Sequence, residues 1–592
     1  MKKLLTVLMF AVFLLSTCTV FALTGVEAEN ATYDLNDYFS SRDLSGTWDA
    51  AAAVAIDLSH ESDVTITEAG VYVLSGETRG TVTVSVGDSD KVQLVLKDVD
   101  ITAEGSAAIY VKNADKVFIT LAEGSENTLT VPSFDPSGEI DAAIFAKDDI
   151  TLNGSGSLTI VSANHGIVGK DDLKITGGTY SITAEGRGID ANDSVRIADG
   201  NFTIVSGKDG IRAKNEENAD KGYVLIAGGT FDIIAGGGSV NGEVHTESMM
   251  MGFRGGWNNS QTVGGTDTGS AKAIKASGRM IILDGAITVD AADDAFHTDG
   301  DLTVNGGTLT ARSRDDGMHA DNTLTINAGS VTISQSYEGI EATAIVINGG
   351  DISVTSSDDG LNSSGGSDQS GFWRNDMFAS DGSSITINGG NIYVNAQGDG
   401  IDSNGDLYVN GGYIVVSGPT SSGNGALDYN GNAVITGGTV IAAGATGMAE
   451  NFGSASTQAS ILVNLSGSAD TITVSSANGS ELFSGTVEKA YQCVVISSPD
   501  LAVGQTYTVA NSTGSTQITP SSIISGSGSG MGNFGGGFGG GRNGRGNQQQ
   551  APDGNQQSPD GQQLPNDLFM PGGQMPGGQT PGGWERHGGG RR

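Results

Sequence analysis

The chain has 592 residues and a formal net charge of −38, because 68 Asp and Glu residues outnumber 30 Lys and Arg residues. This negative charge argues against nucleic acid as a partner, since a phosphate backbone requires a basic surface. It also argues against direct adsorption to anionic lipid. The length is sufficient to bury a large core.

Residues 1–28 are predicted to be a secretory signal. Two lysines precede an apolar run that is too short for a stable membrane anchor, and small residues allow cleavage after Ala22 or Ala28. A lipid anchor on Cys18 is a weaker alternative, because Thr17 is bulkier than the residue usually found there. No other apolar stretch could span a bilayer. The sequence therefore predicts a secreted, extracellular protein without a transmembrane segment in its mature form, and a lipid anchor would place it at the cell surface.

Residues 29–90 are predicted to form an N-terminal lead-in and cap. The first part suggests a short helix or a loop, and β alternation begins in the second part. The end of a stack of strands exposes an unpaired edge, so a covering segment is expected there.

A repeat of about 22 residues organises residues 91–449. In residues 293–350 each repeat opens with acidic residues, a small residue and an apolar one, and two short alternating strands follow around a Gly turn. Such a unit cannot bury its inward residues alone, but units stacked about 4.8 Å apart can. The sequence therefore predicts an all-β protein with a parallel β-helix. The small anchor residues that mark its coils are Gly166, Gly188, Gly210, Ala273, Ala295, Gly317, Gly339, Gly360, Gly400 and Gly425.

An asparagine recurs before the Gly turn of successive repeats. Amides one strand spacing apart can hydrogen-bond along a ladder, and Asn tolerates the left-handed turn conformation. We therefore interpret these residues as structural: Asn305, Asn327, Asn348, Asn388 and Asn410.

Insertions interrupt the repeat at residues 215–221, 236–270 and 363–381. The two longer ones carry aromatic residues, which are only 6% of the chain. Flat aromatic side chains suit the apolar face of a sugar ring, although these side chains could instead fold back to cover the coils. The candidate carbohydrate-binding residues are Phe253, Trp257, Phe372 and Trp373.

The repeat stops near residue 450. Residues 450–520 contain hairpin-like strands and are predicted to form a small antiparallel β unit at the C-terminal end of the coils. Residues 521–592 are rich in Gly, Gln and Pro and are predicted to be a disordered tail. After signal cleavage only Cys493 would remain, so no intramolecular disulfide can form.

Acidic residues recur beside the anchors and should form a column, because residues one period apart lie above one another. Unit charges about 4.8 Å apart repel by roughly 0.9 kcal/mol in water and about 3.5 kcal/mol at an effective dielectric constant of 20. Calcium between the carboxylates would relieve this repulsion, but some carboxylates could merely accept hydrogen bonds from the next turn. The candidate Ca²⁺ ligands are Asp293, Asp294, Asp299, Asp315, Asp316, Asp321, Glu338, Asp358, Asp359, Asp399 and Asp402.

Two histidines, His297 and His319, are also one period apart. With Asp299 and Asp321 nearby they could hold a transition metal. A neutral pair in the ladder is the more common arrangement.

The chain resembles the carbohydrate-binding β-helix domain family of cellulolytic clostridia. The shared features are the D-D-G-[ILM] and N-G-G-x-[ILV] coil pattern and the segments RDLSGTWD, GVYVLSG, VQLVLKDVDIT and SSPDLAVGQTYTV, within residues 39–510. The resemblance implies a right-handed coil stack similar to pectate lyases, bound Ca²⁺, and binding of cellulose-like and acidic sugars without cleavage.

The function expected is therefore non-catalytic, Ca²⁺-dependent binding of a polysaccharide. One alternative is a Ca²⁺-dependent polysaccharide lyase, which needs a Lys or Arg base beside the metal. Another is a surface adhesin rod without glycan specificity. The candidate bases near the anchors are Lys170, Arg187, Arg212 and Lys275.

Overall fold

The structure is a computed structural model that describes residues 26–28, 31–242, 269–364 and 380–526. Residues 1–25 of the predicted signal, residues 527–592 of the predicted tail, and the four candidate aromatic residues lie outside these ranges. These aromatic residues are Phe253, Trp257, Phe372 and Trp373. No helix in the described ranges is long and apolar enough to cross a membrane.

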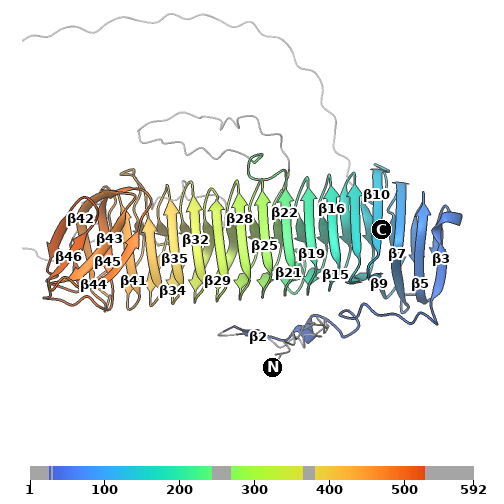
Figure 1. Cartoon of the computed structure of the whole chain (residues 1–592), viewed down its shortest axis with the longest axis horizontal. Coiled ribbons are helices and arrows are strands. Elements are labelled where there is room, and N and C mark those ends of the chain that lie inside the picture. Colours follow the sequence, from blue (N-terminus) through green and yellow to red (C-terminus); the bar gives the residue numbers. More distant parts are fainter. Residues whose placement is uncertain (1–25, 29–30, 243–268, 365–379, 527–592) are drawn as a thin grey trace, which may run out of the picture. The chain divides into compact units, whose positions relative to one another are not determined.

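Strands are almost the only regular secondary structure in the described chain, and most coils contribute one strand to each of three parallel ladders (Figure 1). Ladder 1 has the longest strands. Along the chain of each coil, the ladder 2 strand comes directly after the acidic residues, and the ladder 3 strand comes after the ladder 2 strand. This arrangement confirms the predicted parallel β-helix.

Ladder 1 contains β10 (Glu126–Phe134), β13 (Ser157–Ser162), β16 (Thr179–Ala184), β19 (Asn201–Ser206), β22 (Thr230–Ala235), β25 (Ala286–Ala291), β28 (Thr308–Ser313), β30 (Ser330–Gln335), β32 (Asp351–Ser356), β35 (Asn391–Ala396), β38 (Tyr413–Ser417) and β41 (Thr439–Gly444). Ladder 2 contains β4 (Val64–Ile66), β6 (Val82–Ser85), β8 (Ile109–Asn113), β11 (Ala142–Ala146), β14 (His165–Gly169), β17 (Ile189–Ala191), β20 (Ile211–Ala213), β23 (Ile274–Ala276), β26 (Phe296–Thr298), β33 (Leu361–Ser363), β36 (Ile401–Ser403) and β39 (Leu427–Tyr429). Ladder 3 contains β3 (Val54–Asp57), β9 (Lys116–Leu121), β12 (Asp149–Gly154), β15 (Asp172–Ile175), β18 (Ser194–Ile197), β21 (Tyr223–Ile226), β24 (Met280–Ile282), β27 (Leu302–Val304), β34 (Ser384–Ile387), β37 (Asp406–Val409) and β40 (Ala433–Ile435). Four longer strands take part in two ladders each: β5 (Gly70–Thr78), β7 (Lys91–Gly105), β29 (Met318–Ile326) and β31 (Ile340–Ile347).

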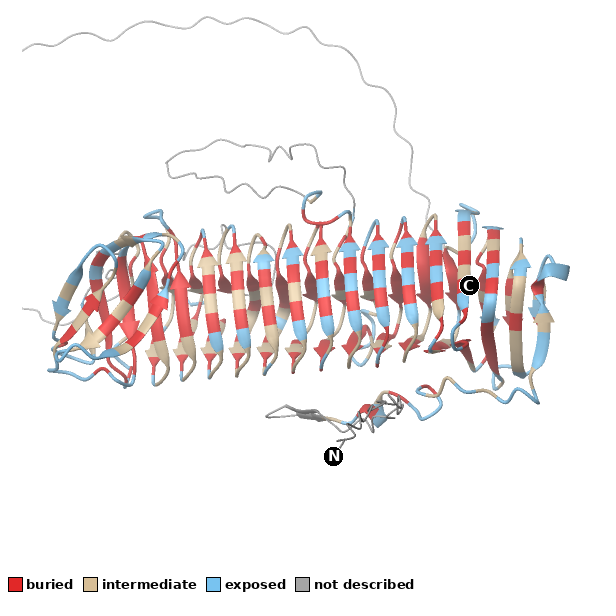
Figure 2. Cartoon of the chain, in the orientation of Figure 1, coloured by how far each residue is buried: buried red, intermediate tan, exposed pale blue. Residues whose placement is uncertain are grey.

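Alternation along most ladder 1 strands places every second side chain in the core (Figure 2). In β28, Leu309 and Ala311 are buried, whereas the neighbouring Thr308 is exposed. The parallel register places a buried side chain at the same position of the next coil, where Val331 pairs with Leu309. Neighbouring coils therefore bury a continuous column of aliphatic side chains that no single coil could bury.

The predicted asparagine ladder is present. The Nδ2 atom of each Asn donates to the Oδ1 atom of the previous one, at 2.7 Å for Asn327 to Asn305 and for Asn348 to Asn327. The series continues through Asn388 at 2.8 Å and Asn410 at 2.9 Å. The glycine two residues after each Asn has a positive φ, for example 87° at Gly307, so the turn uses a conformation that suits glycine.

One predicted anchor is displaced by a residue. The N–H of Gly400 donates to the carbonyl of Gly425, just as the N–H of Gly360 donates to the carbonyl of Asp399. Gly425 therefore occupies the place of the acidic residue, and Ala426 is the anchor of that coil. The preceding loop, residues 418–425, hides this shift in the sequence.

Within the predicted lead-in, the strands β3 to β6 already pair in parallel with the coils that follow. The segment before them contains β1 (Val26–Ala28), β2 (Ala31–Tyr33) and the 3₁₀ turn η1 (Leu35–Asp37); a second turn, η2 (Leu58–His60), follows β3. Phe39 is buried against a group on ladder 3 that includes Tyr223 and Leu225. Asp43 is 1% exposed and bonds to Lys116 Nζ at 2.6 Å. This segment thus covers the outer face of ladder 3.

Except for the parallel pair of β42 and β48, the strands after ladder 1 pair antiparallel, as expected for the C-terminal unit. They are β42 (Ser460–Ser468), β43 (Thr471–Ser476), β44 (Glu481–Thr486), β45 (Ala490–Ser497), β46 (Tyr507–Ala510), β47 (Ser515–Ile518) and the short β48 (Ile524–Ser525). β45 pairs with β41 and β42, and a second sheet has the order β44-β43-β46-β47. Cys493 on β45 is a buried free thiol, and burial raises its pKa to about 11.

Candidate functional site: an acidic column on ladder 2

The outward residue of each short ladder 2 strand lies directly over its equivalent in the next coil. His297 pairs with His319, and Glu341 pairs with Asn362. The expected stacking of residues one period apart is therefore observed. In order, this column consists of Asp190, Arg212, Lys275, His297, His319, Glu341, Asn362, Asp402 and Asp428.

A second column is formed by the residue just before each anchor. Its carboxylates use part of their hydrogen-bonding capacity on the backbone of the next coil. Oδ1 of Asp294 accepts from the N–H of Asp316 at 3.0 Å, and Oδ1 of Asp359 accepts from the N–H of Asp399 at 2.6 Å. The structural interpretation of these acids is therefore correct in part, but it leaves the second oxygen of each carboxylate to be accounted for.

Three groups in and beside the two columns bring ligand atoms within 4.8 Å of one another. The first contains Asp293, Asp294 and Asp315, and a cation is already present there. Lys272 Nζ lies 2.9 Å from Asp293 Oδ1 and 2.5 Å from Asp294 Oδ2. Although burial works against the charged forms, this ion pair lowers the pKa of Asp294 and raises that of Lys272.

The second group contains Asp316, His319 and Glu341. Nδ1 of His319 lies 3.0 Å from both Asp316 Oδ2 and Glu341 Oε2, and Nε2 lies 3.1 Å from Asp321 Oδ1. The carboxylates overcome the effect of burial and raise the pKa of His319. A protonated imidazole has no lone pair for a metal. Its single positive charge offsets only part of the negative charge of the carboxylates around it, and burial, together with Asp294 and Glu341, raises the pKa of Asp316.

The His297 ring stacks on the His319 ring, with centroids 4.8 Å apart and planes 10° from parallel. His297 lies between Asp294 at 2.7 Å and Asp299 at 2.9 Å, which raise its pKa against the effect of burial. These contacts favour the protonated form of both rings over a neutral pair and over a transition-metal site. Asp299 and Asp321 thus serve as partners of the two imidazoles.

The third group contains Asp359, Asp399 and Asp402. No Lys, Arg or His side chain forms an ion pair with Asp399 or Asp402 in the described part of the chain. Their removal from water, followed by repulsion from Asp359, raises the pKa of both Asp399 and Asp402. Asn362 pairs with Asp402 in the register, and its Oδ1 atom is buried without a hydrogen-bond partner among the described residues.

The remaining candidates adjoin this third group. Glu338 accepts from Asn362 Nδ2 at 2.6 Å, and burial, together with Asp316 and Glu341, raises its pKa. The carbonyl of Asp358 accepts from the N–H of Gly398 at 2.9 Å. Glu450, which the sequence did not bring to attention, continues the acidic surface; burial and Asp428 raise its pKa to about 7.

A charge pattern in the sequence could have distinguished the third group from the other two. Up to Lys272 and Lys275 the two columns contain both acidic and basic residues, but no lysine follows until Lys489. Arg374, outside the described residues, is the sole arginine between Arg314 and Lys489. Basic residues are therefore rare in the sequence of the later coils.

The candidate lyase bases belong to the earlier coils and are engaged there. Arg187 and Arg212 pair with Asp209 at 2.9 Å and Asp190 at 2.7 Å. Lys170 lies over the Phe145 ring, 5.0 Å from its centroid. Lys275, the nearest of the four to the third group, is five register steps from Asp402, or roughly 24 Å.

Comparison with known proteins gives three matches. A family model described as "Carbohydrate-binding domain-containing protein" matches residues 60–317 and 313–360, just over half of the chain. A protein of that description from Acetivibrio thermocellus is 52% identical over 182 residues, which are 30% of this chain and 64% of the relative. A solved structure of a polysaccharide lyase-like protein from C. thermocellum, a gadolinium derivative, is 28% identical and covers 47% of this chain and 98% of its own. Its TM-score is 0.34, too low to support a conclusion about this chain.

Proposed function

Because the chain belongs to the family of carbohydrate-binding domain-containing proteins, we propose that it is a secreted, non-catalytic polysaccharide-binding protein. Its ligand is an acidic or cellulose-like plant polysaccharide, and Ca²⁺ held by the third acidic group is required for binding the acidic polymer.

The observation that carries the calcium proposal is the composition of the third group. Ca²⁺ takes six to eight oxygen ligands at about 2.3–2.6 Å. Asp359, Asp399 and Asp402 offer carboxylate oxygens within 4.8 Å of one another, and Asn362 adds an amide oxygen that has no partner among the described residues. All are hard oxygen donors, and burial, followed by repulsion from neighbouring carboxylates, raises the pKa values of Asp399 and Asp402. These residues fit a calcium ion.

The net charge of −38 makes such an ion necessary for an acidic ligand. A polyuronate would be repelled by the bare columns. A cation bound by three carboxylates and one amide oxygen retains coordination positions for carboxylates of the polymer. Calcium would therefore serve both the stability of the coils and the recognition of the ligand.

The absence of cleavage is supported by the position of the basic residues. Proton removal beside a uronate carboxyl group needs a base within hydrogen-bond reach of the substrate. The four candidates are engaged in other contacts, and Lys275 lies roughly 24 Å from Asp402 along the register. Secretion is supported by the two lysines and the apolar run at the N-terminus.

The test is binding of the full chain to polygalacturonate and to insoluble cellulose, with CaCl₂ and with a chelator. We expect polygalacturonate to be bound in CaCl₂ and released by the chelator. Retention of polygalacturonate in the chelator would contradict the role of calcium, and an absorbance of unsaturated products in the same mixtures would contradict the non-catalytic assignment. Binding of neither polymer in either buffer would contradict the function itself.

A further inference from the structure

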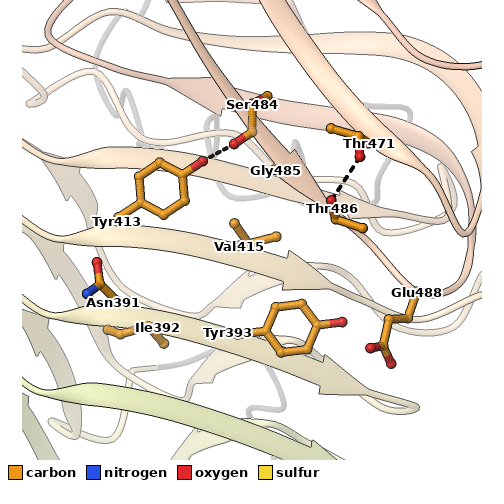
Figure 3. Close-up of a pocket in the computed structure, with 10 residues that line it drawn as sticks. All are labelled: Asn391, Ile392, Tyr393, Tyr413, Val415, Thr471, Ser484, Gly485, Thr486 and Glu488. Carbon is orange, nitrogen blue, oxygen red and sulfur yellow. Dashed lines mark hydrogen bonds between the residues drawn. The ribbon is translucent and has the colours of Figure 1, made fainter.

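A cleft of about 420 Å³ lies where ladder 1 meets the C-terminal sheet. Tyr393 on β35 and Tyr413 on β38 lie on one side, and residues of β44 such as Gly485 and Thr486 lie on the other (Figure 3). The volume is within the range of small-ligand sites, roughly 300–1,000 Å³. The cleft lies outside the residues matched by the family model.

Aromatic residues enter the outer face of ladder 1 at this place. The register runs from Thr332 through Ser353 to Tyr393, so the position held by Tyr393 carries a small hydroxyl residue in the two preceding coils. Tyr413 similarly follows Asn391. This change gives the cleft two flat side chains that the earlier coils lack at these positions.

The hydroxyl groups of the two tyrosines differ in their hydrogen bonds. The hydroxyl of Tyr413 donates to the carbonyl of Ser484, and Val415 beside it lies so close to Gly485 that an added Cβ would be 2.9 Å from it. These contacts join the C-terminal sheet to the coils. Tyr393, by contrast, has a buried hydroxyl that lies near the Glu488 carboxylate without a hydrogen bond of good geometry to any described residue.

A second polar atom beside Tyr393 also lacks a partner. Asn395 Nδ2 donates to Glu488 Oε2 at 2.8 Å, but the Asn395 Oδ1 atom is buried without a partner in the described ranges. Buried polar atoms of this kind usually have a partner. If the tyrosines were only filling space under the C-terminal sheet, neither orphaned atom would be explained.

The charges around the cleft indicate the class of ligand. Glu488 is the charged residue that lines it among the described residues, and the amino group of the adjacent Lys489 donates to the carbonyl of Ala396. The cleft thus offers no free cation to a uronate. Its aromatic faces and polar edges suit a sugar ring, which has apolar faces and hydroxyl edges.

We propose that this cleft is a second glycan subsite, which holds one or two rings of a neutral oligosaccharide against Tyr393 without Ca²⁺. It deepens the proposed polysaccharide-binding function and rests on it for the class of ligand. The hydroxyl of Tyr393, which lines the cleft, completes its hydrogen bonds with a sugar hydroxyl.

The test is calorimetric titration of the full chain with cellotetraose in a chelator. Wild-type protein binds, Tyr393→Phe weakens binding about fivefold through loss of one hydrogen bond, and Tyr393→Ala removes measurable binding. Because the hydroxyl has no good partner in the protein, Tyr393→Phe should leave the melting temperature unchanged. The matched control is Tyr408→Phe, since the hydroxyl of Tyr408 donates to Asp406 at 2.7 Å on ladder 3, away from the cleft.

The proposal is overturned if folded wild-type protein does not bind cellotetraose, or if Tyr393→Ala binds it as wild type does. The same samples titrated with polygalacturonate in CaCl₂ test the calcium-dependent function separately. An Asp399→Asn/Asp402→Asn variant should lose polygalacturonate and retain cellotetraose. Loss of both ligands in that folded variant would show one shared site and would also overturn the proposal.

Discussion

Asn362 lies beside Asp402 in the register of β33 and β36, with its two amide atoms in opposite situations. Its Nδ2 atom donates to Glu338 at 2.6 Å, whereas its Oδ1 atom is buried without a partner among the described residues. The bond to Glu338 fixes which end of the amide remains free. The free end is an oxygen on the residue that pairs with Asp402, and oxygen donors are the ligands that a hard cation prefers.

The first prediction concerns stability in calcium. Millimolar CaCl₂ should raise the melting temperature of the full chain, because an ion that binds the folded state at 100 times its dissociation constant adds about 2.7 kcal/mol. Asp399→Asn/Asp402→Asn should abolish this shift, and in a chelator it should melt above wild type because repulsion in the group is relieved. Differential scanning calorimetry in both buffers measures each effect.

The control for that variant is the exposed Asp220 in the 215–221 loop. Asp220→Asn changes the charge by one unit but leaves the acidic columns intact, so its calcium shift should equal that of wild type. If calcium raised the melting temperature of Asp399→Asn/Asp402→Asn as much as that of wild type, the stabilising ion would bind at another site.

The second prediction concerns pH. The folded-state pKa values of Glu338, Asp399 and Asp402 are raised, and that of Glu450 is raised to about 7. A raised pKa means that the folded state binds protons more tightly, so stability is lost as the pH rises from the ordinary carboxyl value near 4 through the folded value. In a chelator the melting temperature should therefore fall between about pH 5 and about pH 8.

Calcium should reverse this trend, because the ion binds the ionised carboxylates. The gain in melting temperature from CaCl₂ should grow over the same pH range. A melting temperature that rises with pH in the chelator would contradict the charge excess inferred for the later coils.

The sequence allowed the vertical contacts to be predicted, because one period fixes which residue lies above which. The stacking of His297 on His319 and the bond from Asn327 to Asn305 follow directly from a spacing of 22. The raised pKa values of the imidazoles did not follow, because they depend on contacts between columns. The role of Lys272 was also readable in principle, since it lies one period before Asp294.

Other contacts could not be read from the period. The shift of an anchor from Gly425 to Ala426 depends on how a loop re-enters the stack. Asp43 bonds to Lys174, 131 residues further along the chain, and no repeat relates the two. The cleft at Tyr393 likewise requires a C-terminal sheet whose position relative to the coils no local pattern encodes.

The third prediction separates the first acidic group from the third. Lys272→Met should destabilise the protein by about 3–5 kcal/mol in a chelator, because Asp293 and Asp294 lose a buried partner. Calcium should recover part of this loss by occupying the vacated position between the carboxylates. Chemical denaturation in CaCl₂ and in the chelator gives both values.

Lys221→Met is the matched control. The Lys221 side chain is 42% exposed and pairs with Asp193, so its loss should cost less than about 1 kcal/mol and should add no calcium response. If Lys272→Met behaved like Lys221→Met, the charge balance assigned to the first group would be incorrect.

The last prediction concerns the N-terminal segment on ladder 3. Asp43 accepts from Lys116 at 2.6 Å and from Thr151 at 2.8 Å, so Asp43→Ala leaves a largely buried lysine unpaired. We expect the free energy that keeps the segment docked to fall by about 3–5 kcal/mol. Because the coils pair with one another without this segment, the loss should appear as local undocking. Hydrogen exchange should therefore accelerate in residues 33–47 and around Tyr223, and remain slow in ladder 1.

Asp34→Ala is the control, since exposed Asp34 caps only η1 and its loss should cost about 1 kcal/mol. Uniform acceleration throughout the coils in Asp43→Ala would mean that the segment is part of the cooperative core.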